Sequence, residues 1–373
     1  MATSFRNGRV LVEGQLRTGL VVTIDEAGIQ YVGPDPGSGD IVDLDGGILA
    51  PGFIDTQVNG GGNVLFNDAP TVETIERIGE AHRRFGTAGY LPTLISDDLP
   101  VIHQAIEAVQ SAIEQGVPGV LGIHIEGPFL NVERRGIHLA SKIQTLDADV
   151  IDALTRLNGG RTLITLAPEK TSPDLIRALV RRGAIVAAGH TDASYEVATN
   201  AIKAGVTGAT HLFNAMSPLG NREPGVVGAV LDSDTVTAGI IVDGRHVSPA
   251  TLRIALRARS ADAFMLVTDA MPSVGGVDEF WLQGKRIRVE DGVCVDDQGT
   301  LAGSDLNMIS AVRNAVRLLQ TPLPAALAMA STVPARFLGL GQYGSIAVGR
   351  AASLVWLSND LDVQGMWIKG RHH

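Results

Sequence analysis

Three residues with metal-binding side chains follow short apolar runs in this 373-residue chain. His190 ends VAAGH, His211 ends GATH about one βα unit later, and Glu126 ends IHIE. Two imidazoles and one carboxylate that leave a coordination position open suit a catalytic divalent ion such as zinc, ferrous iron or manganese. A single histidine at a strand end is more often a hydrogen-bonded polar residue, but here three suitable residues recur at the same point of the pattern. We therefore expect Glu126, His190 and His211 to hold a divalent metal ion, with zinc as the first choice.

Asp269 closes the apolar run MLVTD and has no basic neighbour in the sequence. Taken alone, this carboxylate could be the N-cap of a following helix. Close to a metal ion, however, the charged form of a carboxylate is favoured, and it can take a proton from a water molecule bound to the metal. We therefore expect Asp269 to act as the general base.

These residues can meet only if the elements that carry them end at one place, and residues 51–340 have the corresponding pattern. Apolar runs that end in polar or Gly-rich loops alternate with stretches of helical period such as TVETIERIGEAHRRFG. Eight such runs occur: ILAPGFID, GYLPTL, VLGIHIEG, LITLAPE, IVAAGH, VTGATHLF, TAGIIVDG and FMLVTDA. In six of them an ionisable or metal-binding residue stands at the C-terminal end: Asp55, Glu126, Glu169, His190, His211 and Asp269.

A doubly wound open sheet could also supply eight strands, but it would spread these side chains along a line. In a (β/α)8 barrel the C-terminal strand ends converge on one face, where the loops build the active site. We therefore expect a (β/α)8 TIM barrel over residues 51–340, with a hairpin-like insertion at residues 280–303. Residues 1–50 have the pattern of short β-strands separated by turns that contain Gly, Pro and Asp, and residues 341–373 again have the pattern of β-strands. We expect these terminal segments to form one small β-sandwich domain together.

Composition excludes several classes of function. The chain is 45% hydrophobic and 19% charged, enough for a large core, and its net charge of -10 repels nucleic acid and anionic membranes. Apolar runs stay below the roughly 18 residues of a membrane span. The single cysteine, Cys294, forms no internal disulfide, and the N-terminal residues lack an apolar leader. We expect a soluble cytoplasmic protein that binds neither nucleic acid nor membrane.

Other histidines receive different interpretations. His124 lies two residues before Glu126, so a strand points both side chains to the same side. We expect His124 to be a hydrogen-bonded residue of the barrel interior. His82 and His103 lie in stretches of helical period and are expected at the surface.

A series of short motifs resembles the amidohydrolase superfamily, and within it the N-acetylglucosamine-6-phosphate deacetylases. The motifs are PGFIDTQVNG (51–60), HIEGPFLN (124–131), RGIHLA (135–140), LAPE (166–169), GHTDA (189–193), THLFNAM (210–216), NREPG (221–225), DGRHV (243–247), VTDAM (267–271) and LAGS (301–304). They occur in the family's order and span nearly the whole chain. GHT, THLFNAM and the Glu-Gly-Pro element are together specific to these deacetylases, whereas PGFID is shared by many amidohydrolases.

The resemblance implies a role for each matching residue. Glu126, His190 and His211 would be the metal ligands, Asp269 the general base and acid, and His138 a substrate contact that helps to stabilise the oxyanion. His246 would also contact the substrate, and the phosphate would be bound by Arg222, by His246 and by the backbone at Asn214 and Ala215. Leu301, Ala302 and Gly303 would line the sugar pocket. In the family the arginine that matches Arg222 reaches across from a second subunit, which implies a homodimer.

One departure from the wider superfamily concerns Gln57 and Asn59. Many amidohydrolases carry His-x-His at these places and hold a second metal there. Neutral amides bind divalent transition metals poorly compared with imidazole. The chain therefore resembles a one-metal branch, with one divalent ion per subunit and with Gln57 left to bind a metal-bound water or the sugar.

The implied reaction removes the acetyl group from N-acetylglucosamine 6-phosphate and yields glucosamine 6-phosphate and acetate. A metal-activated water attacks the amide, and Asp269 takes and then returns the proton. An N-acetylgalactosamine-6-phosphate deacetylase stays open as an alternative. The two sugars differ only in the orientation of one hydroxyl group, and the sequence does not show which orientation the site accepts. A cyclic amidase is disfavoured by the missing paired histidines. A metal-binding scaffold without catalysis is disfavoured by Asp269.

Overall fold

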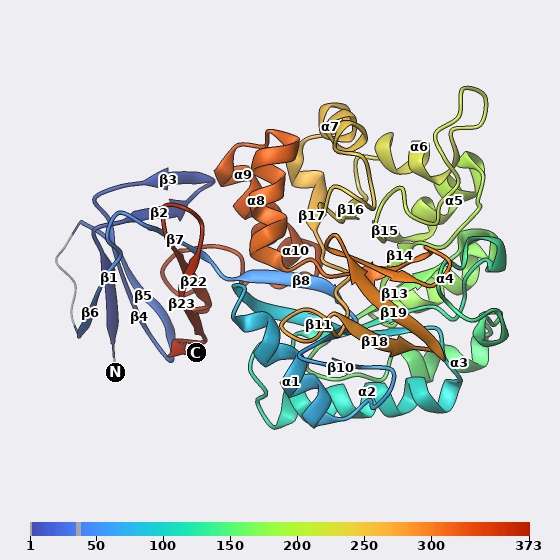
Figure 1. Cartoon of the computed structure of the whole chain (residues 1–373), viewed down its shortest axis with the longest axis horizontal. Coiled ribbons are helices and arrows are strands. Elements are labelled where there is room, and N and C mark those ends of the chain that lie inside the picture. Colours follow the sequence, from blue (N-terminus) through green and yellow to red (C-terminus); the bar gives the residue numbers. More distant parts are fainter. Residues whose placement is uncertain (1, 35–38) are drawn as a thin grey trace.

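The computed structural model of the chain describes residues 2–34 and 39–373. Its largest sheet is built from parallel strands that follow one another in chain order (Figure 1). These eight strands are β8 (Phe53–Val58), β11 (Thr87–Ile95), β12 (Gly122–Glu126), β13 (Arg161–Leu166), β14 (Ile185–Ala188), β15 (Val206–Ala209), β16 (Thr237–Ile240) and β17 (Phe264–Leu266). A parallel bridge between Val58 and Ala270 joins the segment after β17 to β8 and closes the sheet. The predicted (β/α)8 barrel is confirmed.

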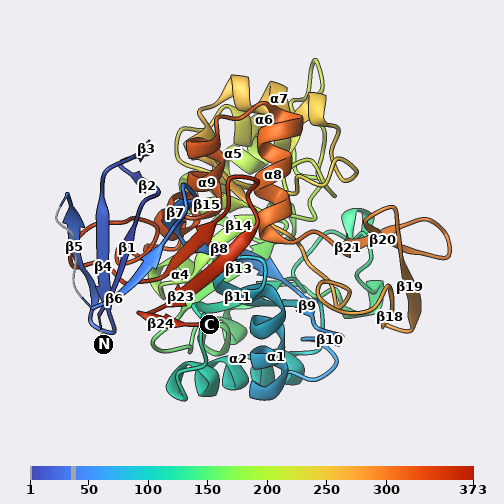
Figure 2. The ribbon, with the colours of Figure 1, turned by 60° about the vertical axis from the view of Figure 1, so that its left-hand side comes forward.

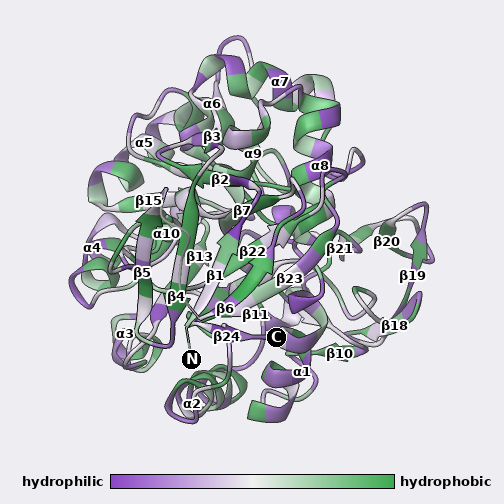
Figure 3. Ribbon diagram, turned by 90° about the vertical axis from the view of Figure 1, so that its left-hand side faces the viewer, coloured by the Kyte–Doolittle hydropathy of each residue, from purple (hydrophilic) through white to green (hydrophobic). Residues whose placement is uncertain are grey.

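Helices between the strands cover the outside of the barrel (Figure 1). They are α1 (Val72–Arg83), α2 (Leu99–Glu114), α3 (Ala148–Leu154), α4 (Pro173–Arg181), α5 (Tyr195–Ala204), α6 (Gly225–Leu231), α7 (Pro249–Ala258), α8 (Met308–Leu319), α9 (Leu323–Ala330) and α10 (Thr332–Phe337). Ser172 and Ser194 cap α4 and α5, because each hydroxyl accepts a backbone N–H of the first turn. In Figure 3, α2 and α7 alternate between hydrophobic and hydrophilic residues, so one face of each helix packs on the barrel.

Both ends of the chain contribute to a second pair of sheets. One sheet contains β1 (Thr3–Arg6), β4 (Val21–Asp25), β5 (Gly28–Gly33) and β6 (Asp40–Asp43). The other contains β2 (Arg9–Val12), β3 (Gln15–Arg17), β7 (Ile48–Pro51), β22 (Leu354–Leu357), β23 (Val363–Ile368) and β24 (Arg371–His372). Strand β22 pairs with β7, so the end of the chain lies against its beginning (Figure 2). Phe5 and Trp367, one from each sheet, meet edge to face in the core between the sheets, which is the expected β-sandwich.

An antiparallel arm follows the last barrel strand. It consists of β18 (Glu279–Leu282), β19 (Lys285–Glu290), β20 (Val293–Asp296) and β21 (Leu301–Ser304), which confirms the predicted insertion. Figure 2 shows the arm on the opposite side of the barrel from the terminal sheets. Two short strands, β9 (Gly60–Gly61) and β10 (Val64–Leu65), follow β8. Within residues 2–34 and 39–373, no helix combines the length and the apolar character needed to cross a membrane.

Candidate functional site

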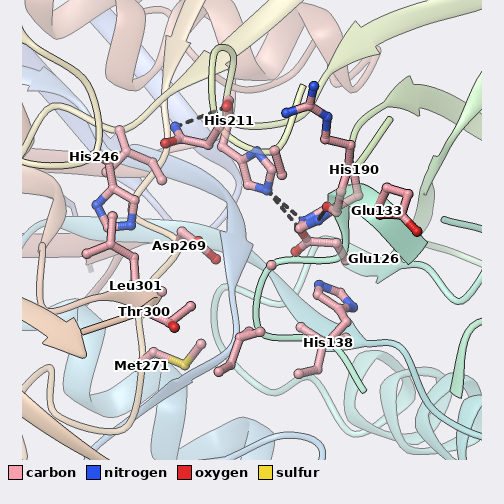
Figure 4. Close-up of a pocket in the computed structure, with 18 residues that line it drawn as sticks. Glu126, Glu133, His138, His190, His211, His246, Asp269, Met271, Thr300 and Leu301 are labelled. Carbon is pink, nitrogen blue, oxygen red and sulfur yellow. Dashed lines mark hydrogen bonds and ion pairs between the residues drawn. The ribbon is translucent and has the colours of Figure 1, made fainter. Parts of the chain in front are cut away.

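The C-terminal ends of the barrel strands open into a cavity of about 360 Å³. His190, His211 and Asp269 line it, and their φ angles are 48°, 32° and 52°, a left-handed region that residues other than glycine rarely adopt. This conformation turns the chain two residues after β14 and β15 and three residues after β17, and the side chains face the cavity (Figure 4). Such strain persists only where surrounding bonds hold it, and it is common at functional sites.

Glu126, His190 and His211 lie in contact at this face. Oε1 of Glu126 is 3.0 Å from Nε2 of His190 and 3.1 Å from Nε2 of His211, and the two nitrogens are 3.0 Å apart. All three residues are at most 5% exposed. Figure 4 shows the three side chains pointing at one another from three different strand ends. The barrel therefore brings together the three residues that were predicted from the sequence as metal ligands.

The donor set fits a divalent cation. Nδ1 of His190 donates to the carbonyl of Arg134 over 2.8 Å, so in the metal-binding tautomer of the ring the lone pair of Nε2 faces the Glu126 carboxylate. Two acceptors that face each other are stable only with a cation or a proton between them. The edges of this triangle are close to the roughly 3.3 Å expected between ligands that bind zinc at about 2.0 to 2.1 Å. Two imidazoles and one carboxylate also match the ligand chemistry of zinc, iron and manganese.

His138 lies beside this group, and its ligand atom is within 4.8 Å of those of Glu126 and His190. Its Nδ1, however, accepts the backbone N–H of Ser96 over 3.2 Å. Burial and the neighbouring His190 lower the pKa of His138 to about 3, so the ring is neutral and carries its proton on Nε2. A nitrogen that carries a proton cannot bind a metal. His138 is therefore a hydrogen-bond donor, and His211 is the better third ligand.

Two buried amides hold the carboxylates of the site. Nε2 of Gln57 donates to Oε2 of Glu126 over 2.9 Å and to Oδ1 of Asp269 over 3.1 Å. Nδ2 of Asn59 donates to the same Oδ1 over 2.6 Å. Burial, together with the charge of Glu126, raises the pKa of Asp269 to about 6. Gln57 was expected to bind a water or the sugar, but its amide nitrogen is engaged by two carboxylates, and it is absent from the described residues around the cavity.

The remaining predicted residues divide into two groups. Those that line the cavity are His138, Asn214, Ala215, His246, Leu301 and Gly303. Two do not line it in the described part of the chain. Ala302 lies between Leu301 and Gly303 on β21 and points to the opposite side, where it is completely buried in the core of the arm. Arg222 is exposed in the loop before α6.

Glu169 stands at a strand end like the metal-site residues, but it has a different position. Its Oε1 accepts Nδ2 of Asn131 over 2.8 Å and the backbone N–H of Asp192 over 2.6 Å. Its Oε2 accepts the hydroxyl of Thr191 over 2.5 Å. Asn131 in turn donates its backbone N–H to the carbonyl of His190. Glu169 therefore braces the loop that carries His190 in its strained conformation.

Ser96 and Arg134 also belong to the site, although neither was predicted from the sequence. Ser96 fixes the ring of His138, and the carbonyl of Arg134 fixes the ring of His190. The contacts from the backbone N–H of Ser96 and the backbone carbonyl of Arg134 cannot be predicted from residue type, because every residue except proline has both groups. Only the position of Arg134 within a motif-rich stretch was a signal, since it lies between HIEGPFLN and RGIHLA.

Comparison with known proteins places this geometry in a family. Residues 48–372 match the profile described as Amidohydrolase family. The chain is 46% identical to an N-acetylgalactosamine-6-phosphate deacetylase of Shewanella sp. (strain ANA-3), with 88% of this chain and 83% of that protein covered. It is 38% identical to an N-acetylglucosamine-6-phosphate deacetylase of Haemophilus influenzae, with 88% and 87% covered.

Solved structures agree. The crystal structure of N-acetylglucosamine-6-phosphate deacetylase from Pasteurella multocida superimposes with a TM-score of 0.96 at 37% identity and full coverage of both chains. The corresponding enzyme from Mycobacterium smegmatis gives a TM-score of 0.92 at 32% identity, with 100% of this chain and 99% of that chain covered. The chain belongs to the amidohydrolase family.

Proposed function

We propose that the chain hydrolyses the acetamide of N-acetylglucosamine 6-phosphate to give glucosamine 6-phosphate and acetate. One observation carries the proposal: the carboxylate of Asp269, the N–H of His138 and the Glu126, His190 and His211 donor set surround one cavity. Metal-assisted amide hydrolysis needs a proton acceptor, a hydrogen-bond donor to the oxyanion and a Lewis-acid site, and these three parts can provide them in that order. The substrate is proposed from the relatives at 34 to 46% identity, which are named for deacetylation of this sugar phosphate or its epimer.

The residues of the chain divide the chemistry. A divalent ion held by Glu126, His190 and His211 would supply Lewis-acid activation of water and of the amide carbonyl. Asp269 accepts a proton from the attacking water and transfers it to the nitrogen of the breaking C–N bond. The proton lost by the water therefore ends on the amine, and acetate is the other product. The neutral His138 donates its Nε2 hydrogen to the carbonyl oxygen as negative charge develops there. Gln57 and Asn59 hold Oδ1 of Asp269, which leaves Oδ2 free for this transfer.

We further propose zinc as the ion, one per subunit, with iron and manganese as alternatives. The proposed assembly is a cytoplasmic homodimer in which Arg222 reaches the neighbouring active site. The exposure of Arg222, away from the cavity of its own chain, supports this arrangement. The proposed division of the chain is a barrel over residues 51–340 and a terminal domain from residues 1–50 and 341–373.

A second candidate substrate is N-acetylgalactosamine 6-phosphate, because the relative with 46% identity is named for it. The test is acetate release from both 6-phosphosugars and from unphosphorylated N-acetylglucosamine, with and without a chelator. The proposal expects the highest kcat/KM for N-acetylglucosamine 6-phosphate and loss of activity with the chelator. A preference for the galactosamine epimer would select the second candidate, and no acetate from either would overturn both.

A further inference from the structure

Asp243 and His246 form a buried acid–imidazole pair at the edge of the cavity. Oδ2 of Asp243 lies 2.5 Å from Nδ1 of His246, and the two side chains are 4% and 5% exposed. His246 lines the cavity, whereas Asp243 lies behind it, away from the other described lining residues. In Figure 4 the ring of His246 faces the cavity from the side opposite Glu126, with Asp269 between them.

The backbone around this pair leaves the carboxylate little freedom. Oδ1 of Asp243 accepts the backbone N–H of Arg245 over 2.8 Å and that of His246 over 2.9 Å. Gly244 makes the turn possible with a φ of 77°. On the other side, Nδ2 of Asn314 on α8 donates to the carbonyl of Val242 and anchors the loop. With Oδ1 engaged, Oδ2 is the oxygen that meets the ring.

This geometry determines the proton positions of His246. A carboxylate only accepts hydrogen bonds, so Nδ1 of His246 must carry a proton, and Nε2 is the ring nitrogen available to the cavity. When phosphate binds, a proton shared between a phosphate oxygen and Nε2 would be compensated by the charge of Asp243. Asp269 adds a second negative charge nearby. Farther out, Arg245 pairs with Asp291. Arg134, a cation at the cavity, is already paired with Asp192.

We propose that Asp243 is a positioning residue that holds the ring of His246 through Nδ1 and so aims Nε2 at the phosphate group of the substrate. The inference rests on the proposed function, since a dianion in this cavity needs a compensating charge in a chain of net charge -10. Phosphate oxygens accept hydrogen bonds, so an imidazole that presented only a lone pair would repel them. Asp243 does not touch the sugar and acts through the ring.

The discriminating variant is Asp243→Asn. Its amide oxygen can keep the two backbone N–H groups, and its amide nitrogen then faces Nδ1 of His246 as a donor. The ring proton therefore moves from Nδ1 to Nε2, as in other acid–imidazole pairs, and no carboxylate remains at Nδ1 to compensate a second proton on the ring. We expect kcat/KM for the phosphosugar to fall by about 10-fold to 100-fold, the range for one charge-assisted hydrogen bond, mainly through KM. Activity on unphosphorylated N-acetylglucosamine should fall much less.

Two controls separate positioning from folding. Asp291→Asn removes an exposed carboxylate that pairs with the same loop, and it should leave both parameters unchanged. Asp243→Asn should have no further effect in a His246→Ala background, because Asp243 acts through that ring. Equal losses on both substrates, or additive losses in the double variant, would show that Asp243 merely supports the fold.

Nitrogen-15 NMR of the imidazoles tests the pair without turnover. Wild-type protein should show a proton on Nδ1 of His246 that Asp243→Asn removes, and inorganic phosphate should shift the wild-type ring signals. A wild-type ring protonated only on Nε2, or a ring unaffected by inorganic phosphate, would overturn the inference. If the protein releases no acetate from either phosphosugar, the proposed function fails, and these spectra still decide the role of Asp243.

Discussion

Nδ2 of Asn59 donates a hydrogen bond to Oδ1 of Asp269 over 2.6 Å. Asn59 occupies a place where many amidohydrolases carry a metal-binding histidine, and here its amide donates a hydrogen bond to a carboxylate. Gln57 does the same for Asp269 and Glu126 together. The N–H groups of the two amides thus balance carboxylate charge, as a second metal would otherwise do.

We predict one tightly held metal ion per chain. The amide nitrogens of Gln57 and Asn59 already face the carboxylates. Among the described residues this leaves one group of imidazole and carboxylate donors at the site, Glu126 with His190 and His211. Elemental analysis of active protein should give one divalent ion per chain, and a chelator should abolish activity. Two tightly held ions per chain would contradict the prediction, and activity that resists the chelator would rule out a metal-dependent reaction.

Asp269→Asn should bind metal and phosphosugar but lose about 10²-fold to 10⁴-fold or more in turnover. The new amide oxygen can still accept from Gln57 and Asn59, so the site keeps its shape while the proton acceptor is lost. The measurements are kcat and metal content, with Asp291→Asn as the matched change at an exposed carboxylate. Turnover close to that of the wild type would show that another group is the base.

Glu169→Gln should weaken metal retention by about 10-fold to 100-fold, the usual effect of losing a group that supports a ligand. A neutral amide cannot accept from Thr191, Asp192 and Asn131 at once, so the strained backbone of His190 loses its brace. Competition with a chelator measures the metal affinity directly. Glu196→Gln, an exposed change in the neighbouring α5, is the control, and an equal effect there would refute the specific role of Glu169.

Asp55 should make stability depend on pH. Burial raises its pKa to about 7, against an ordinary value near 3.8, although Thr268 donates to it. A raised pKa means that folding takes up a proton, so this stabilisation is present below pH about 4 and is lost as the pH rises through about 7. Asp55→Asn has no such proton. Its Tm relative to the wild type should therefore increase between pH about 5 and about 8, and a constant difference would show that Asp55 is ionised throughout.

The periodicity of apolar runs predicted the barrel and the meeting of Glu126, His190 and His211, because parallel strands in a barrel end on one face. The same rule placed Glu169 with them, but residue type alone cannot distinguish a ligand from a brace. His124 is confirmed as an interior residue, bonded to Thr165. His82 was expected at the surface, yet it is fully buried, with Nε2 bonded to the carbonyl of Gly60.

That error has a physical cause. The helical period shows that one face of α1 is buried, but a backbone carbonyl that accepts a hydrogen bond from a histidine on that face is not visible in the sequence. Burial lowers the pKa of His82 to about 4, so the ring is accommodated in its neutral form. The hydrogen-bond partners of His138 and His190 could not be predicted for the same reason, since they too come from segments distant in the sequence. The meeting of Glu126, His190 and His211 was therefore predictable, whereas the hydrogen bonds that orient these side chains were not.

Arg222→Ala should lower kcat/KM for the phosphosugar by about 10-fold to 100-fold, because a guanidinium binds phosphate oxygens through its planar fork. Activity on unphosphorylated N-acetylglucosamine should hardly change. Arg222 is exposed and lies outside the cavity among the described residues, so we expect the contact to come from the neighbouring subunit of the proposed homodimer.

Mixing provides the decisive measurement. An Arg222→Ala subunit keeps its own Asp269, and an Asp269→Asn subunit can supply Arg222 to it, so mixed dimers contain one complete site. Activity on the phosphosugar should therefore exceed the sum of the two separate variants once subunits exchange. If mixing restores nothing while Arg222→Ala still discriminates between the two sugars, Arg222 acts within its own chain. Equal losses on both sugars would show that Arg222 supports the fold or the dimer, and the 6-phosphate would then need another partner, with His246 the nearest candidate.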